Sequence, residues 1–425
     1  MNKEIYSFAK KIFPYPRSIT GDGVRETLKE IKKINPKLKI YSIPSHSKVF
    51  DWHVPLEWKV NEAYIITPDG KKICDFKKNN LHLIGYSIPV NKIISKNQLE
   101  KNLHSLPKQP NAIPYITSYY ERNWGFCISE NDRKKLKNGD YKVVINTSLF
   151  KGFLNYGEIL IKGKSKKEVF LSTYICHPSL ANNEISGPSV LTFIAKWISS
   201  LKNRRYSYRI IFIPETIGSI TYLSKNLKNM KKNTMYGFNL SCVGDDREYS
   251  YLQSKYGNTL SDKIALRVLK SKVKKFKIYN WLDRGSDERQ FCAPGIDLPV
   301  CSILRTKHGM YPEYHTSLDK LGKVVTKKGL NGSYNIYKTC IEKIEKDLIP
   351  ISNILCEPQM GKRGLYSNIS RKSPVLKTEL MMDVLSYCDG NSSVIDISKL
   401  CNTSPKETLE ITNVLHKHNL ISYIS

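Results

Sequence analysis

The chain lacks several features that would place it in a functional class at once. No apolar run reaches the roughly 18 consecutive residues of a membrane span, and the first residues lack the apolar core of a secretion signal. The ten cysteines are scattered singly, with no CxxC pair. Isolated cysteines are typical of buried free thiols in a reducing compartment. We therefore expect a cytoplasmic protein with no membrane attachment.

The signatures of several common catalytic classes are also absent. The sequence contains no GxSxG, no GxxxxGK followed by Ser or Thr, no HExxH, and no GxGxxG after a strand. Their absence argues against a nucleophile-elbow hydrolase, a P-loop protein, a zincin and a dinucleotide-binding domain.

Acidic residues are scarce relative to basic ones, which leaves a net charge of +30. Such a charge can indicate a nucleic-acid or anionic partner. Here the excess is mostly lysine spread along the chain, as in residues 225–233. We interpret these lysines as solvated surfaces and not as a binding patch.

The chain divides into four segments that differ in their predicted secondary structure. Residues 1–45 predict two helices around a glycine-rich turn, and residues 46–107 predict a small β-rich inserted domain. Residues 108–350 continue the first segment, alternating strand and helix from about residue 140. Residues 351–425 form a separate C-terminal segment.

The alternation predicts an α/β fold, a mixed and mostly parallel sheet with helices on both faces. We expect strands at 142–146, 156–161, 168–175, 208–213, 235–241 and 299–304. We expect helices at 187–201, 217–229, 259–271 and 328–346.

The C-terminal segment predicts a winged helix-turn-helix. Three helices are expected at 376–388, 393–401 and 404–418, followed by a strand at 420–424. The third helix would begin with Ser404 as N-cap, Pro405 at the first helical position and Glu407 closing a capping box.

The most informative segment is the loop between the strand at 168–175 and the next helix. It carries His177, Asn183 and Glu184, and the carboxyl ends of strands are where α/β sheets bind ligands and metals. A neutral imidazole with an amide or carboxylate oxygen can hold zinc. A lone histidine there can equally be a hydrogen-bonded structural residue.

Three later strands also end in polar clusters. Glu215 follows a fully apolar strand, where it could act as a general base with a raised pKa or simply stabilise a helix N-terminus. Asp245 and Asp246 could hold a metal or an ammonium group, or form a surface turn. The segment 283–289, which includes Glu288, could bind substrate or be a salt-bridged loop.

The segment 305–319 is hard to explain by core packing, because two histidines, two carboxylates and two tyrosines fall within it. His315 could ligate a metal, with Asp319 orienting it. Two histidines, His177 and His315, with a carboxylate base at Glu215 favour metal-assisted hydrolysis.

These pieces resemble the zinc aminopeptidases of the bacterial leucyl aminopeptidase type. The matching motifs are His177, Asn183-Glu-Ile-Ser-Gly187, Glu215-Thr-Ile-Gly218 and Tyr314-His-Thr316. Nearly the whole chain is similar to a bacterial group that joins such a domain to a small inserted domain and a C-terminal winged helix. That group is often associated with polysaccharide biosynthesis loci.

The resemblance implies roles for individual residues. His177 and His315 match metal ligands, Asn183 matches a zinc-bridging aspartate, and Glu215 matches the general base. Thr216 and Ser241 stand where that family has two further acidic ligands. We therefore expect one zinc per chain, held by His177, Asn183 and His315 with a water.

The leading hypothesis is a zinc-dependent amide hydrolase, formally an aminopeptidase, acting on a small peptide or another amide. Asp245, Asp246, Glu288 and Tyr314 are the candidate substrate-binding residues. One alternative is a deacylase of an amino-sugar precursor. Another is a catalytically degenerate protein that binds a ligand or partner.

The winged helix offers a further possibility, DNA binding. Residues 351–425 carry eight Lys or Arg against seven Asp or Glu. A DNA reader concentrates positive charge on its recognition helix. We expect this segment to mediate protein contact or homo-oligomerisation instead.

Overall fold

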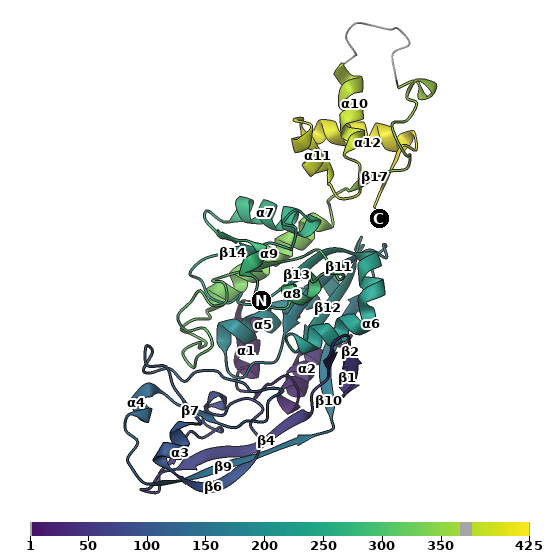
Figure 1. Cartoon of the computed structure of the whole chain (residues 1–425). Coiled ribbons are helices and arrows are strands. Elements are labelled where there is room, and N and C mark those ends of the chain that lie inside the picture. The colour runs from purple at the N-terminus through teal and green to yellow at the C-terminus, as the bar shows by residue number, and fades with distance from the viewer. Residues whose placement is uncertain (1, 366–375, 425) are drawn as a thin grey trace. The chain divides into compact units, whose positions relative to one another are not determined.

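The computed structural model describes residues 2–365 and 376–424, which fall into two compact units, Met1–Lys338 and Thr339–Ser425. Figure 1 traces the elements of each unit along the chain. Among the described helices, none combines the length and the apolar character needed to cross a bilayer.

The first unit is built on an eight-stranded mixed sheet in the order β1-β10-β12-β11-β13-β16-β14-β15. The neighbours from β12 to β16 are parallel, whereas β1, β10 and β14 pair antiparallel with their neighbours toward the centre. Every residue of β11 is buried, as expected for a strand covered on both faces. The strands are β1 (Lys39–Pro44), β10 (Phe153–Ile161), β11 (Glu168–Tyr174), β12 (Ser207–Ile213), β13 (Thr234–Asn239), β14 (Ser250–Leu252), β15 (Lys277–Tyr279) and β16 (Val300–Leu304).

Helices flank this sheet. The mostly buried helix α5 packs on β11 and against α1 and α2, while α7 packs on β13 and β16. Gly187 at the start of α5 has no room for a Cβ, which would meet Thr173 and the backbone of Leu240. The helices are α1 (Asn2–Ile12), α2 (Asp22–Ile34), α5 (Ser186–Ser200), α6 (Ile217–Asn233), α7 (Leu260–Lys272), α8 (Glu288–Phe291) and α9 (Lys327–Ile344), with short turns η2 (Ala181–Ile185) and η3 (Trp281–Asp283).

A second, four-stranded sheet in the order β5-β4-β9-β6 belongs to the same unit. It consists of β4 (Glu57–Ile66), β5 (Lys72–Ile73), β6 (Val90–Ser95) and β9 (Asp140–Phe150). The expected strand at 142–146 is real, but its placement in the main sheet is wrong: it lies in β9, which pairs with β4 and β6. The small β-rich region therefore continues well past residue 107.

The first unit also contains short elements, of which α3, α4 and β7 lie beside the small sheet and β2 lies beside β1 of the main sheet (Figure 1). Two strand pairs, β2 with β3 and β7 with β8, lie outside it. The elements are β2 (Lys48–Val49), β3 (Trp52–His53), β7 (Leu103–His104), β8 (Phe126–Cys127), α3 (Lys96–Glu100), α4 (Glu130–Arg133) and η1 (Asn80–His82).

The described residues of the second unit contain the end of α9, three further α-helices and a two-stranded sheet, and they have their own apolar core. The elements are β17 (Pro350–Ser352), η4 (Gly361–Arg363), α10 (Leu376–Ser386), α11 (Val394–Leu400), α12 (Pro405–Lys417) and β18 (Ile421–Tyr423). Ser404 caps α12 by accepting from the Glu407 amide, and Pro405 opens the helix as expected. The expected capping box does not close, because the Glu407 carboxylate accepts from the Thr403 hydroxyl.

Candidate functional site

The site is built where β11 ends. The chain leaves β11 at Tyr174, passes His177 and enters the π-helical turn η2 before α5 begins. Single π-helical turns are often found at functional sites. The backbone N–H groups of Asn182 and Asn183 both donate to the Asp319 carboxylate, at 2.7 and 3.0 Å. This long-range tether fixes the loop that carries His177.

A buried carboxylate orients His177. The Nδ1 atom lies 3.0 Å from Oε2 of Glu184, so an Nδ1–H donated to Glu184 leaves the Nε2 lone pair facing the cavity. Arg17 holds this arrangement, with its Nε 3.3 Å from Glu184 Oε1 and donating to the His177 carbonyl. Burial lowers the pKa of His177, but the hydrogen bond and charge of Glu184 outweigh it, and the pKa is raised.

His315 faces the same cavity from another segment. Its ring stacks on Tyr314, with centroids 3.9 Å apart, and its carbonyl accepts from the Tyr115 amide. The Tyr115 ring meets both histidine rings edge-on at 5.2 Å. Burial, then the nearby His177 and His308, lower the pKa of His315 to about 3. His315 is therefore neutral, the form that binds metal.

Glu215 stands at the end of β12, beside His177. Its Oε2 lies 3.6 Å from His177 Nε2, too far for a hydrogen bond, so the imidazole lone pair stays available. Burial raises the pKa of Glu215, partly offset by the positive charges of His177 and Arg289. A raised pKa suits a carboxylate that must take and release a proton.

Asp287 lies behind this strand end and supports it. It accepts from the Thr216 amide and from the Ser219 hydroxyl. Thr216 has a φ of 62°, an unusual value for a β-branched residue, so the turn depends on such support. Burial, then the charge of Glu215, raise the pKa of Asp287 to about 8.

These groups open into a cavity of about 360 Å³, within the range of small-molecule sites. Its chemical floor is His177, Glu215 and His315. Its remaining walls include aromatic rings and one arginine: Trp52, Tyr115, Tyr119, Tyr120 and Arg289.

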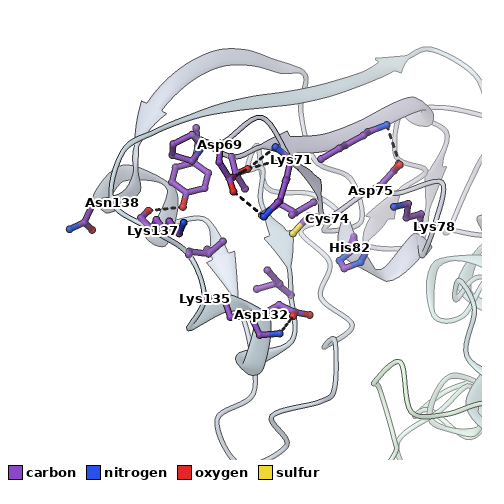
Figure 2. A pocket seen from close by; sticks show the side chains of 17 residues that line it. Asp69, Lys71, Cys74, Asp75, Lys78, His82, Asp132, Lys135, Lys137 and Asn138 are labelled. Carbon is purple, nitrogen blue, oxygen red and sulfur yellow. Dashed lines mark hydrogen bonds and ion pairs between the residues drawn. The ribbon is translucent and has the colours of Figure 1, made fainter.

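A larger cavity of about 700 Å³ lies in the small-sheet region (Figure 2). Five lysines and three aspartates line it, and three of the lysines are already ion-paired, Lys71 with Asp69, Lys72 with Asp75 and Lys135 with Asp132. Its one histidine, His82, has Nδ1 2.8 Å from a backbone carbonyl. Most of the charged groups of this cavity are thus paired with one another, and we place the candidate site at His177, where two histidines and a carboxylate line one cavity.

The residues around His177 fit a zinc ion. Two imidazoles on one zinc have ring centres roughly 5–6 Å apart, and the centroids of His177 and His315 are 5.6 Å apart. Asn183 has a buried amide nitrogen with no partner among the described residues. Exchanging its side-chain O and N lets the Tyr174 hydroxyl donate to the Asn183 backbone carbonyl and accept from the side-chain amide. This leaves the Asn183 side-chain oxygen without a partner among the described residues, although Asn183 is not one of the residues that line the cavity.

Another cluster of metal-type donors is Cys176, His177 and Glu184. Glu184 is already engaged by Arg17 and His177. The Cys176 sulfur accepts from the Glu215 amide, and burial raises the pKa of its thiol well above the ordinary value. These two side chains are thus structural supports of His177.

None of the four candidate substrate-binding residues is among those that line the cavity. Asp245 is buried and accepts from Asn182 and Thr306, and Glu288 is buried and accepts from Asn239 and two backbone amides. Asp246 is exposed beside Thr326, outside the cavity lining. Tyr314 acts on the site through its stacking on His315.

The sequence suggested that Asp319 orients His315, but the Asp319 carboxylate instead anchors the backbone of the η2 turn. The sequence interpretation also missed the aromatic wall, and within the segment 283–289 it singled out Glu288, whereas Arg289 is the residue that lines the cavity. The tyrosine-rich segment 115–120 was the available signal, but nothing local shows that it folds over the strand ends.

Solved structures of other proteins have a fold similar to that of the first unit. A zinc aminopeptidase of Bacillus subtilis superposes with a TM-score of 0.59 at 13% identity, covering 81% of this chain and 94% of that one. A peptidase M28 precursor from Shewanella amazonensis gives 0.57 at 12% identity, covering 84% and 95%. The first unit therefore has the aminopeptidase-like α/β fold, and the mixed sheet expected from the sequence is confirmed.

Sequence comparison is more specific. Residues 6–347 match the family described as "Domain of unknown function (DUF4910)", and residues 349–423 match a winged helix-turn-helix. The chain belongs to the DUF4910 family, and its predicted winged helix is confirmed.

Two relatives from Clostridium acetobutylicum extend over almost the whole chain. One, provisionally named a polysaccharide biosynthesis protein with an aminopeptidase-like domain, is 45% identical over 397 residues, 93% of this chain and 90% of that protein. The other is a crystal structure of a protein provisionally called a peptidase. It has a TM-score of 0.82 and 41% identity, and the match covers 99% of this chain and 96% of that one.

Proposed function

We propose that the chain is a zinc-dependent hydrolase of amide bonds, within the aminopeptidase-like class. The observation that carries the proposal is the convergence of His177, Glu215 and His315 on one cavity. His315 is a neutral imidazole, and Glu184 orients the imidazole of His177. Glu215 is a carboxylate with a raised pKa.

Each residue has a distinct part in the proposed reaction. His177 and His315 hold the metal, with the side-chain oxygen of Asn183 as a third ligand. Bound zinc lowers the pKa of a water molecule and polarises a carbonyl group. Glu215 takes a proton from the attacking water and returns it to the leaving nitrogen. Glu184 and Arg17 keep the His177 Nε2 atom turned toward the cavity.

The proposed stoichiometry is one zinc per chain. Thr216, at the position that resembles a further acidic ligand, donates no carboxylate and instead accepts from Arg289 at 2.6 Å. Ser241, at the other such position, has a buried hydroxyl without a partner among the described residues. A guanidinium beside Thr216 also disfavours a second cation there by charge repulsion.

Metal analysis of the purified protein tests the proposal. We expect about one zinc per chain in the wild type and none in His177→Ala or His315→Ala. The control variant His46→Asn should keep its zinc, because His46 is exposed and its φ of 67° is one that asparagine tolerates. Glu215→Gln should keep the zinc and lose amide hydrolysis at least roughly 100-fold. Zinc retained in both histidine variants, or activity retained in Glu215→Gln, would refute the assignment.

The replaced acidic positions also support a second candidate, a protein that binds a ligand in this cavity without catalysis. It is favoured by Thr216 and Ser241, neither of which supplies a charged metal ligand. The same experiment separates the two functions, because absence of zinc after the wild type has been offered zinc supports the binding protein. A role in polysaccharide biosynthesis, drawn from the name of the Clostridium relative, is compatible with both.

For the winged helix we propose protein contact, including self-association, instead of DNA binding. Helix α12 carries Lys406 and Lys417 against Glu407 and Glu410, so it has no excess of positive charge. Leu400 at the end of α11 is 53% exposed and Tyr387 is 39% exposed. Exposed apolar side chains suit a protein surface better than a phosphate backbone.

A further inference from the structure

The cavity lacks a group that an aminopeptidase substrate would need. A peptide with a free N-terminus presents an ammonium, which calls for a carboxylate in the pocket. The only carboxylate on the described lining is Glu215, which already lies 3.6 Å from the reactive face of His177. The buried Asp245 and Glu288 are satisfied elsewhere.

The charged side chain in the cavity wall is a positively charged arginine instead. Arg289 lines the cavity, is exposed, and donates to Thr216 at 2.6 Å. Among the residues that the structure describes, no carboxylate lies within ion-pairing distance of this guanidinium, although its charge acts on Glu215 at longer range. The donors of this exposed guanidinium that do not reach Thr216 are open to solvent, and an arginine of this kind binds carboxylate or phosphate well.

Two large aromatic side chains stand at the same cavity with much of their surface in water. Trp52 is 40% exposed and Tyr120 is 51% exposed, and their rings meet edge-on at 5.7 Å. The Tyr120 hydroxyl donates to the His53 carbonyl, which fixes the pair to β3. The flat C–H face of a sugar ring packs well on such rings, because the aromatic face carries partial negative charge.

We propose that the site takes an N-acylated amino sugar bearing a carboxylate or phosphate, with the anion on Arg289 and the sugar ring on Trp52 and Tyr120. This inference rests on the proposed amide hydrolase and names its substrate class. Water would add its oxygen to the acyl carbon and the C–N bond would break. The amine nitrogen would take the proton, leaving an amino sugar and a carboxylic acid.

Calorimetric binding to the zinc-loaded full chain tests the ligand class independently of turnover. The probes are N-acetylglucosamine, N-acetylglucosamine 6-phosphate, N-acetylmuramic acid and leucine amide. We expect at least one of the two anionic sugars to bind roughly tenfold or more tightly than the neutral one, and leucine amide to bind weakest. The two anionic probes separate a phosphate from a carboxylate preference.

Variants identify the source of the preference. Arg289→Gln should reduce the ratio of anionic to neutral affinity to about one, whereas Arg284→Gln, which alters an arginine outside the cavity lining that stacks on Trp281, should leave it unchanged. Trp52→Ala should weaken all three sugars by a similar factor. A preference that survives Arg289→Gln would assign it to direct metal binding and overturn the proposal, as would tightest binding of leucine amide.

Acetate release from the same probes tests the hydrolase separately. Acetate from an anionic sugar, lost in Glu215→Gln, supports both proposals. Arginine-dependent binding with no acetate release would support the ligand class and reject the hydrolase.

Discussion

At the scale of single residues, the candidate site consists of three side chains that line one cavity and a buried ion pair that supports one of them. His177, Glu215 and His315 were predictable because polar residues after successive parallel strands meet at one sheet edge. Arg17 and Glu184 were not, because their ion pair joins segments far apart in the chain. Glu184 follows Asn183 directly, and only the structure shows it turned inward onto His177.

The role of Glu184 can be measured. Glu184→Gln keeps an acceptor for the Nδ1–H of His177 but removes the charge that favours this orientation and balances the buried Arg17. We expect zinc affinity, measured by competition with a chelator, to fall about 10–100-fold. Glu313→Gln, the same change in a surface pair with Arg247, should leave it unchanged. Equal affinities in the two variants would show that Glu184 does not position His177.

At the scale of elements, long strands and helices were predictable and short edge strands were not. β14 and β15 each have three residues, too few to show a period. The misplaced β9 carried a readable signal: its residues alternate between exposed and buried, as in a sheet with one wet face. The uniformly buried β11 shows the contrasting pattern of a central strand.

The η2 turn depends on one distant carboxylate. Asp319→Asn would put an amide N–H where a carboxylate oxygen now accepts from Asn182 or Asn183. We expect a loss of about 1–3 kcal/mol in unfolding free energy and faster hydrogen exchange at these two amides. Asp297→Asn, at an exposed position with φ of 51°, is the matched control. Unchanged exchange at both amides would contradict the tether.

At the scale of the whole molecule, the sequence predicted the order of the parts better than their limits. The change to the winged helix was visible because a capped helix, α12, follows two shorter ones and ends at a strand. The far limit of the small β-rich region was missed, because β9 is continuous in sequence with the main sheet strands.

Removing the winged helix, residues 349–423, tests its independence. A chain ending at Asp347 keeps α9, whose Tyr337 hydroxyl bonds the backbone of Ile303 in β16. We expect its zinc content and hydrolysis to match the full chain, while light scattering shows a smaller assembly if the winged helix self-associates. An unchanged assembly would refute that contact. Salt-dependent binding of the full chain to duplex DNA would overturn the protein-contact role.

The side chains proposed to carry the reaction and those proposed to bind the sugar ring come from different parts of the chain. His177 and Glu215 follow the ends of β11 and β12, which are buried in the main core, and His315 comes from the segment after β16. Trp52 and Tyr120 are exposed and come from the β2–β3 hairpin and a neighbouring segment. Exposed positions tolerate substitution far better than buried ones. Related proteins could therefore change their substrate through these exposed positions while keeping the same catalytic residues. The same separation would let an engineer alter the specificity of the cavity by substituting Trp52 and Tyr120 alone.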